Sequence, residues 1–336
     1  MNSHFTLRSA SAAVATAAPE PFHSEAFEAA AVKELARRLK FTTIGHSDMP
    51  AIWEILRHAP GRTTDFSYAG LLMWVDYFHY EYAIVADTLF IKGRVESDIS
   101  KVAFSLPVGR LPLSTCIEIL RQYCEYNGLE LELSAVPECV LPQFLQLSPR
   151  SVEPLDDWSD YLYDAESLAT LKGKKYGKKR NHVNQFLAAY PGYSFVELKP
   201  EMVGEVMRFM DVIDAEGDST PMAVAERRLN RRVLEMIAEG DDVMQGGVLR
   251  DADGHILGFT IGDVKGDTLF VHIEKASRAV AGGFEMLNKS FAEYMCNRYP
   301  EIRYINREDD AGDPGLRHAK ESYHPVELLR KLNIIL

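Results

Sequence analysis

The stretch HILGFTIGDVKGDTLFVHIEKA, residues 255–276, decides the fold class of this chain. Its β-branched and aromatic residues form two runs, 255–264 and 267–276, and Gly266-Asp267 between them is a hairpin turn signal. Directly after it we predict an amphipathic helix over 282–299 and a short strand over 302–306. A hairpin that leads into a helix and a further strand indicates an α/β domain.

On both sides of this hairpin, the second half of the sequence predicts further strands and helices. On the N-terminal side we predict a strand over 193–198, helices over 200–214 and 221–240, and a strand over 243–251. On the C-terminal side we predict a short helix over 313–323 and one last strand over 326–336. The predicted order is β-α-α-β-β-β-α-β-α-β.

The first half repeats this order, although the two halves share little sequence. We predict strands over 40–44, 82–93 (as a hairpin), 102–109 and 129–136, and helices over 47–59, 66–79, 113–128 and 137–147. The two copies join within 148–164, and a further helix is predicted within 24–41. The predicted organisation is a partly disordered leader over 1–36, an N-terminal domain over 37–155 and a C-terminal domain over 156–336.

Composition limits the classes of function. The 336 residues carry a formal net charge of -12, which argues against nucleic-acid or membrane binding by the whole surface but permits a local basic site. The four cysteines have no metal-ligand spacing, so we predict reduced thiols, no metal site and a cytoplasmic location. No run in the sequence approaches the ~18 apolar residues of a membrane span.

A dense basic segment, KGKKYGKKRNH (172–182), stands out in this acidic chain. Val183, Phe186, Leu187 and Tyr190 follow at helical spacing and predict a buried stripe beside it. Basic residues without an interleaved acid repel one another unless an anion is bound, which favours phosphate binding over a solvated lysine face. The candidate phosphate-binding residues are Lys174, Lys175, Lys178, Lys179, Arg180, Asn181 and His182.

Two polar residues follow each other at strand spacing in the hairpin. His272 and Glu274 are predicted to face one side of the strand, with Val271, Ile273 and Lys275 on the other. Glu274 is a candidate catalytic base, because a carboxylate next to a cluster of cations is electrostatically matched. His272 is a candidate substrate-binding residue, and the alternative for both is a structural hydrogen bond at the strand end.

The segment YINREDDAGDPGLRHAKESYHP (304–325) concentrates charge in a turn between a strand and a helix. Loops held by a rigid scaffold often carry chemistry, so Glu308 and Asp309 are candidate catalytic residues or anchors for a substrate amine. The alternative is a salt-bridged turn in which Asp313 caps the helix. Further candidates for substrate binding are Asn306, Arg307, Arg317 and Lys320, together with Asn288 in the segment 285–295.

The aromatic residues of the first half invite a different interpretation. The segment LLMWVDYFHYEY (71–82) carries Trp74, Tyr77, Phe78, Tyr80 and Tyr82. We expect these side chains to pack in the core or between the domains, in preference to forming a stacking platform.

Four segments, 172–186, 266–276, 285–295 and 304–325, together resemble one bacterial family of poorly defined function, which is grouped with the C-terminal domain of phosphatidylglycerol lysyltransferase. The segment 63–93 resembles the N-terminal repeat of the same family. The element order is that of GNAT-type acyltransferases, and tandem copies occur in relatives that transfer aminoacyl groups. The resemblance therefore implies two tandem GNAT-like (acyl-CoA N-acyltransferase) domains, each a mixed, mostly antiparallel sheet flanked by helices.

The resemblance also implies roles for individual residues. Tyr323 matches the place where GNAT enzymes often carry a tyrosine acid. Members that use acetyl-CoA carry an R/Q-x-x-G-x-G/A loop where this chain has Arg278 to Gly283, with alanine at the first glycine position. Arg278, Gly282 and Gly283 are therefore candidate donor-binding residues at a helix N-terminus, and the alternative is an ordinary strand–helix turn.

These features predict an acyl or aminoacyl transferase that moves an activated acyl group to an amine or hydroxyl of a small molecule or peptide. We expect aminoacyl-tRNA or acyl-CoA as co-substrate and no permanently bound cofactor. Glu274 or an acid of the 308–310 turn would deprotonate the acceptor, and the helix over 174–190 would line the same cleft as Glu274, Glu308 and Arg317. The alternatives are an acetyl-CoA-dependent N-acetyltransferase and a non-catalytic protein that binds an anionic ligand.

Overall fold

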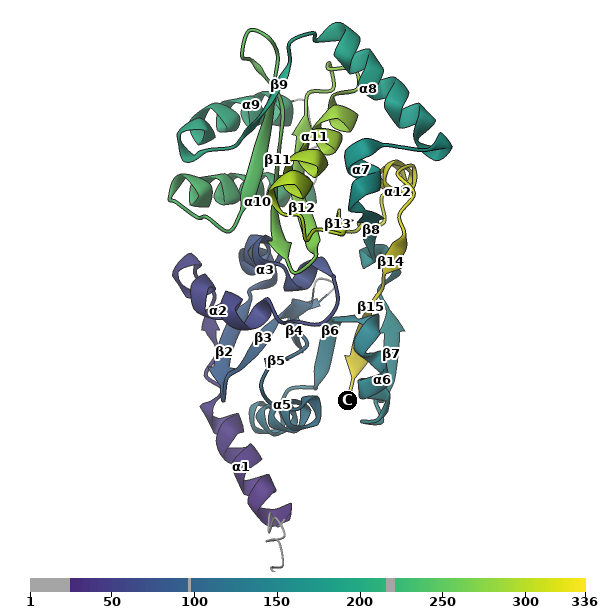
Figure 1. Cartoon of the computed structure of the whole chain (residues 1–336). Coiled ribbons are helices and arrows are strands. Elements are labelled where there is room, and N and C mark those ends of the chain that lie inside the picture. Colours follow the sequence, from purple (N-terminus) through teal and green to yellow (C-terminus); the bar gives the residue numbers. More distant parts are fainter. Residues whose placement is uncertain (1–24, 96–97, 216–220) are drawn as a thin grey trace, which may run out of the picture.

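The computed structural model describes residues 25–95, 98–215 and 221–336, so most of the predicted leader lies outside the described residues. Two β-sheets, each flanked by helices, stand one above the other in Figure 1. The first half of the chain builds most of the lower sheet, and the second half builds the upper sheet.

The first sheet has the strand order β1-β2-β3-β4-β6-β15-β7, with β5 beside β3. Its strands are β1 (Thr42–Thr43), β2 (Glu81–Val85), β3 (Thr88–Val95), β4 (Asp98–Phe104), β5 (Val108–Gly109), β6 (Glu132–Pro137), β7 (Ser151–Pro154) and β15 (Lys331–Ile335). The helices of this half are α1 (Glu25–Arg38), η1 (His46–Asp48), α2 (Met49–Leu56), η2 (Thr64–Phe66), α3 (Tyr68–Met73), α4 (Val75–Phe78), α5 (Leu113–Asn127), η3 (Glu138–Val140) and α6 (Leu141–Leu145), where η marks a 3-10 helix.

The second sheet has the strand order β14-β8-β13-β12-β11-β10-β9. Its strands are β8 (Asp160–Asp164), β9 (Ser194–Glu197), β10 (Gln245–Arg250), β11 (Ile256–Lys265), β12 (Thr268–Ala276), β13 (Tyr304–Asn306) and β14 (Glu327–Leu329). The helices are η4 (Asp156–Trp158), α7 (Ala165–Thr170), η5 (Lys174–Tyr176), α8 (Gly177–Ala189), η6 (Pro200–Met202), α9 (Val203–Ala215), α10 (Pro221–Ala238), α11 (Gly283–Arg298) and α12 (Pro314–Glu321).

Parallel pairing is confined to the middle of each sheet in the described part of the chain. β4 runs parallel to β6, β12 runs parallel to β13, and the other pairs are antiparallel. The expected fold class, two mixed and mostly antiparallel sheets flanked by helices, is confirmed. β13 ends at Asn306 while β12 continues to Ala276, so the chain after Asn306 leaves the sheet beside the second half of β12.

The C-terminal strand corrects one prediction. The single strand expected over 326–336 is wrong, because β14 pairs with β8 in the second sheet whereas β15 pairs with β6 and β7 in the first. The joining segment 148–164 also contains two strands that were not predicted, β7 and β8. The unit expected over 156–336 therefore gives its last strand to the first sheet.

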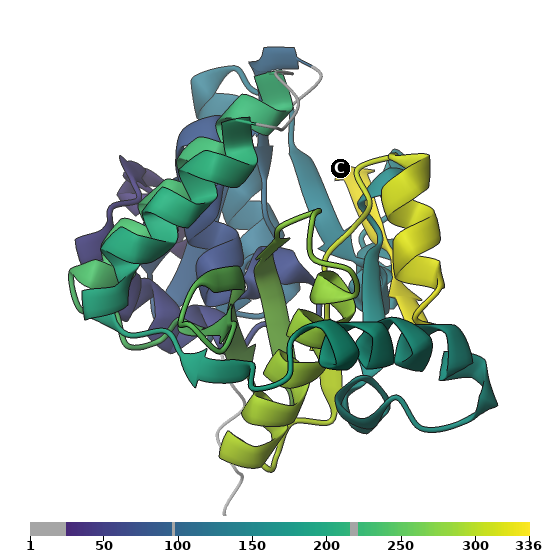
Figure 2. The ribbon, with the colours of Figure 1, turned by 90° about the horizontal axis from the view of Figure 1, so that it is seen from above.

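The buried side chains form two clusters on opposite faces of the second sheet. α9 and α10 cover one face and share a continuous core with the first half of the chain. α7, α8 and α11 cover the other face with a separate core around Phe186 and Phe291, and Figure 2 shows these two groups of helices on either side of the strands. Each fully buried aromatic side chain stabilises such a core by about 2–3 kcal/mol. The turn after Asn306 contacts both parts, because Glu308 accepts the hydroxyl of Thr64 from the first half and its carbonyl oxygen accepts the N–H of Tyr161 in β8.

Candidate functional site

A cavity of about 200 Å³ lies between the two halves of the chain. Its lining residues are Thr64, Asp65, Gly70, Leu71, Trp74, Phe78 and Tyr80 from the first half, then Trp158, Glu308, Asp309, Ala311 and Lys331. A second cavity of about 220 Å³ adjoins it, since both are lined by Asp65, Leu71, Phe78, Tyr80 and Trp158. A larger groove of about 610 Å³ between α1 and α5 is lined by none of the predicted site residues.

The first wall of the cavity is a turn that joins η2 to α3. Ser67 caps α3, because its Oγ accepts the N–H of Gly70 at 3.1 Å and donates to the carbonyl oxygen of Thr64 at 2.7 Å. Glycine is required at position 70, since an added Cβ would overlap the Thr64 carbonyl. The tight turn brings Asp65 to the cavity from one side of α3.

The opposite wall is the turn after β13. The side chain of Asn306 accepts the N–H of Glu308 at 2.7 Å and donates to Asp160 at 2.9 Å. The buried amine of Lys320 donates to two backbone carbonyls of the same turn. These contacts hold Glu308 at φ +59°, a left-handed conformation that is uncommon outside glycine and that concentrates at functional sites.

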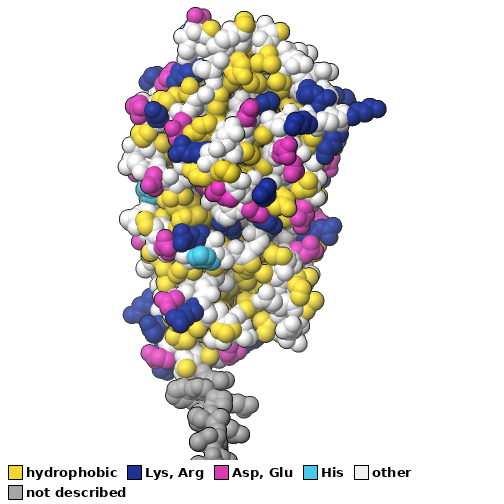
Figure 3. All heavy atoms as spheres, in the orientation of Figure 1, with side chains coloured by type: hydrophobic (Ala, Val, Ile, Leu, Met, Phe, Trp, Pro, Cys, Tyr) yellow, Lys and Arg dark blue, Asp and Glu magenta, His cyan; other side chains and the backbone are white. Residues whose placement is uncertain are grey.

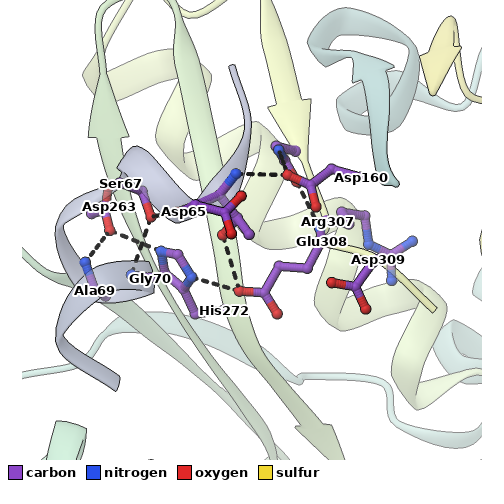
Figure 4. Close-up of polar contacts among 12 residues, drawn as sticks. Asp65, Ser67, Ala69, Gly70, Asp160, Asp263, His272, Arg307, Glu308 and Asp309 are labelled. Atoms are coloured by element: carbon purple, nitrogen blue, oxygen red, sulfur yellow. Dashed lines mark hydrogen bonds and ion pairs between the residues drawn. The ribbon is translucent and has the colours of Figure 1, made fainter. Parts of the chain in front are cut away.

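A chain of three ionisable side chains connects the two walls (Figure 4). The Nδ1 of His272 lies 2.8 Å from Glu308 Oε1, and its Nε2 lies 2.8 Å from Asp263 Oδ2. Residues of the first half of the protein contact both ends of this chain of side chains. The N–H of Ala69 donates to Asp263 at one end, and the hydroxyl of Thr64 donates to Glu308 at the other. Burial lowers the pKa of His272, but the two carboxylates outweigh burial and raise this pKa to about 10.

The predicted common face of His272 and Glu274 is wrong because the strand contains a β-bulge. The pairing of β11 with β12 shifts between Ile261 and Gly262, so His272 is the extra residue. His272 then points toward α3 and Asp263, whereas Glu274 points toward α11 and accepts a hydrogen bond from Asn288 at 3.0 Å.

Acidic residues crowd around the buried Lys331 at the cavity. The amine of Lys331 forms ion pairs with Asp65 at 2.8 Å and Asp160 at 2.9 Å. Burial raises the pKa of Asp65. Burial, followed by the charges of Asp160 and Glu308, also raises the pKa of Asp309 to about 6 against the opposing effect of Lys331. Asp309 therefore combines access to the cavity with a pKa near neutrality, which suits a proton acceptor.

A second polar cluster lies on the α11 side of the sheet. Glu274 accepts hydrogen bonds from Asn288 and from Arg307, whose Nη2 lies 2.9 Å away. The ring of Tyr323 lies between Lys179 Nζ at 3.9 Å and the Arg307 guanidinium at 4.8 Å. Burial raises the pKa of Tyr323, so its phenol is a poor acid near neutral pH. Lys179 also forms an ion pair with Glu285 at 3.5 Å.

Comparison with known proteins places this architecture in a family. The model of the family described as "Phosphatidylglycerol lysyltransferase, C-terminal" matches residues 57–333. The chain belongs to this family. The match spans both sheets, and it includes the residues of the cavity and of the second polar cluster.

Solved structures agree with the family assignment. A conserved protein of unknown function from Bacteroides thetaiotaomicron is 28% identical, with a TM-score of 0.78 over 89% of this chain and 99% of that chain. L-PGS from Bacillus licheniformis is 14% identical, with a TM-score of 0.61 over 87% and 91% of the two chains. FemX is 9% identical, with a TM-score of 0.58 over 89% and 98%. The chain thus shares the fold of L-PGS and FemX.

A curated relative covers less of the chain. An uncharacterized protein of Mycoplasmoides gallisepticum is 22% identical over 175 residues, which are 52% of this chain and 54% of that protein. The match thus spans about half the length of the relative. In this chain, no helix within residues 25–95, 98–215 and 221–336 is both long enough and apolar enough to cross a membrane.

The basic segment occupies η5 and the start of α8, on the right of Figures 1 and 3. Lys174, Lys175 and Lys178 are exposed, as are the side chains of Asn181 and His182. Two members of the segment turn inward. Lys179 reaches the second polar cluster, and Arg180 donates to the backbone carbonyls of residues 171 and 173. The buried stripe is confirmed at Val183 and Phe186, whereas Leu187 is exposed.

The remaining predicted residues are distributed around these clusters. Arg317 pairs with Asp310 and with Asp157, and Asp313 caps α12, as the salt-bridged alternative expects. The hydrogen bonds of Arg317 lower the pKa of Asp310 to about 2. Arg278 is exposed, while Gly282 packs so closely on α8 that a Cβ would overlap the carbonyl oxygen of His182. The expected single cleft is therefore divided, because the β-bulge separates Glu274 from Glu308.

Several residues of the cavity were not predicted. Asp65 and Lys331 of the cavity wall were missed, as were Asp160 and Asp263, which contact that wall directly or through His272, since their partners lie on distant segments and no local pattern marks them. The aromatic residues of the segment 71–82 were expected to pack in the core or between the domains, and Trp158 was not singled out. Four of the aromatic side chains in this structure line the cavity: Trp74, Phe78, Tyr80 and Trp158.

Proposed function

We propose that this protein is an aminoacyl transferase whose reacting groups meet in the cavity between the two halves. The observation that carries the proposal is the combination of aromatic walls with the carboxylates of Glu308 and Asp309, beside Asp65, whose charge is paired with Lys331. Aromatic faces and carboxylates together attract a cationic amine. An aminoacyl group, unlike an acetyl group, brings such an ammonium into the site.

In the proposed reaction the acceptor amine or hydroxyl attacks the carbonyl carbon of an aminoacyl ester. A bond forms from the acceptor nitrogen or oxygen to that carbon, and the ester bond to the ribose oxygen of the donor breaks. Asp309 takes the acceptor proton and then gives it to the leaving ribose oxygen, so that Asp309 ends the reaction ionised as it began. Glu308 holds the ammonium of the aminoacyl group through Oε2, since Oε1 contacts His272 and Thr64.

The exposed lysines of the basic segment supply the proposed contact to the donor. Lys174, Lys175 and Lys178 lie next to Lys179, whose amine belongs to the second polar cluster. A tRNA backbone bound at this surface would lie on the side of the second polar cluster, and its aminoacyl end would have to extend past the turn at Arg307 and Glu308 to enter the cavity. The chain belongs to a family described by its lysyltransferase domain, and it shares its fold with L-PGS and FemX. These similarities support this class of reaction.

The packing of Gly282 weighs against acetyl-CoA as the donor. The turn before α11 would have to present free backbone N–H groups to phosphates. Here the backbone of α8 packs closely against that turn at Gly282, and the helix leaves little room for a phosphate at this point.

The test is filter binding of the protein to aminoacylated and deacylated tRNA over a salt series, with excess coenzyme A as competitor. We expect preference for the aminoacylated form, no competition, and a steep loss of affinity with salt. Replacing Lys174, Lys175 and Lys178 together with alanine should reduce the slope of log K against log salt by about 2–3.

The matched control replaces three exposed lysines away from this surface, Lys40, Lys101 and Lys199, with alanine and should leave the slope nearly unchanged. Equal binding of both tRNA forms, or an equal effect of the two triple variants, would contradict the proposal. Tight binding of coenzyme A in place of tRNA would indicate an acetyltransferase.

A further inference from the structure

We propose that Asp263 and His272 are positioning residues that hold Glu308 at the cavity and tie it to α3. The inference rests on the proposed function, because it gives Glu308 the task of holding the substrate ammonium. Asp263 and His272 contact no substrate in this proposal and act through Glu308.

The geometry requires His272 to be a cation. Its side chain is fully buried, and each ring nitrogen lies 2.8 Å from a carboxylate oxygen. Carboxylates are ordinarily ionised at neutral pH and can then only accept, so both ring nitrogens must donate. Among the described residues, the charged groups in contact with the ring are Asp263 from β11 and Glu308 from the turn after β13. Behind Asp263, the buried Lys265 adds a further positive charge, which attracts that carboxylate.

The chain of contacts leaves one oxygen of Glu308 for a ligand. Its Oε1 receives both the His272 contact and the hydroxyl of Thr64 at 3.3 Å. Among the residues drawn in Figure 4, the second oxygen has no contact, and the Glu308 side chain is 26% exposed where it lines the cavity. One oxygen is thus fixed by the protein, and the other is presented to the cavity.

The arrangement is more elaborate than stability needs. A buried ion pair is often no more stable than apolar side chains of the same volume, because both charges lose their water. Here the fold buries an imidazolium between two acids, and it holds Glu308 in a left-handed conformation as well. Preorganised groups of this kind are used where a charge must be bound without rearrangement.

The same contacts connect Glu308 to the first half of the chain. Asp263 Oδ2 accepts the N–H of Ala69 at 2.8 Å, inside α3, and the cavity wall includes Leu71 of that helix and its C-cap residue Trp74. The aromatic wall and the carboxylate therefore keep a fixed distance across the boundary between the two halves. Such precision favours a small cationic group with its carbon chain against the rings.

The test measures binding of alaninamide, which carries the α-ammonium of an aminoacyl group without tRNA, to the full chain by calorimetry. We expect His272→Gln, Asp263→Asn and Glu308→Gln each to weaken binding at least tenfold. The matched control His255→Gln changes an exposed histidine that also contacts an aspartate, and it should bind as the wild type does. Combining His272→Gln with Glu308→Gln should weaken binding no further than Glu308→Gln alone, because His272 acts through Glu308.

A second measurement does not depend on the folding of any variant. Nitrogen NMR of the wild-type protein should show both ring nitrogens of His272 protonated at pH 8. A neutral ring, or unchanged alaninamide binding by a folded His272→Gln, would overturn the positioning role. Failure of the proposed function looks different: the wild type itself would not bind alaninamide.

Discussion

Asp309 and Glu308 are adjacent carboxylates with different surroundings. Glu308 contacts the imidazolium of His272 and the hydroxyl of Thr64, whereas Asp309 is largely buried beside other acids, and its pKa is raised to about 6. Environments that differ in this way divide the tasks between neighbouring acids. One carboxylate is suited to bind a cation, and the other is suited to accept a proton.

This division predicts how activity depends on pH. Asp309 accepts a proton only in its ionised form, so transfer by the wild type should rise with pH around a midpoint near 6. Asp309→Asn should lower the rate by roughly 10²–10⁴ and remove that inflection. Asp253→Asn, at an exposed aspartate, serves as the control. A full pH–rate profile of all three proteins checks this, and an inflection that persists in Asp309→Asn would exclude Asp309 as the base.

The raised pKa of Asp309 has a consequence for stability with a definite sign. Between pH ~4 and the folded pKa of about 6, the folded state binds more protons than the unfolded state. The contribution of Asp309 to the free energy of unfolding therefore falls as pH rises through that window. Asparagine does not titrate. Relative to the wild type, Asp309→Asn should therefore be more stable at pH 7.5 than at pH 4, by up to about 3 kcal/mol. Urea unfolding at the two pH values measures the difference, and a difference of opposite sign would contradict the assignment.

At the scale of elements, the turn between η2 and α3 decides where the first wall of the cavity lies. Ser67 closes the turn through two hydrogen bonds, and Gly70 leaves room for the Thr64 carbonyl. The same turn carries the hydroxyl of Thr64 to Glu308 and the N–H of Ala69 to Asp263. A change in this short element should therefore alter the cavity as well as the stability.

Gly70→Ala tests that coupling. The added methyl group overlaps backbone at Thr64, so we expect a loss of at least about 2 kcal/mol in the free energy of unfolding, together with weaker alaninamide binding. Gly177→Ala is the matched control, because position 177 is helical and a Cβ there meets no atom within 4 Å. The control should be neutral or stabilising by up to about 1 kcal/mol. Denaturant unfolding and calorimetry of both variants give the answer, and equal behaviour would contradict the role of the turn.

At the scale of the whole molecule, the last strand fastens the two sheets together. β14 ends the second sheet at Leu329, and two residues later β15 begins the pairing in the first sheet. Lys331, the first residue of β15, carries its amine to Asp65 of the first half and to Asp160 of the second. A single buried cation thus joins both halves at the edge of the cavity.

The sequence predicts most of this architecture but not the connections across it. Amphipathic periodicity locates α5, α10 and α11, and the turn at Gly266 locates the central hairpin, because these signals are local. No local signal predicts that β15 pairs with the first sheet, since the apolar run after Lys331 would suit either sheet. The β-bulge at His272 has no pattern of its own, and it reverses the face predicted for Glu274. Trp74 and Phe78 follow a packing pattern that cavity walls and cores share.

Lys331→Met tests whether the fastening depends on charge. The variant removes the cation and leaves two carboxylates buried next to each other, so we expect a loss of about 3–5 kcal/mol at pH 7.5. The pKa of Asp65 is already raised by burial and will rise further without Lys331, so protonation at lower pH relieves the repulsion. The loss in the free energy of unfolding relative to the wild type should therefore become smaller as pH falls from 7.5 to 5.

The double variant Lys331→Met with Asp65→Asn should recover part of the loss at pH 7.5, because it buries one charge fewer. The control Lys101→Met, at an exposed lysine, should cost little. Urea unfolding across this pH range decides the matter: a deficit that is constant with pH and unrelieved by Asp65→Asn would mean that β15 is held by its backbone pairing and apolar residues, with the ion pairs contributing nothing.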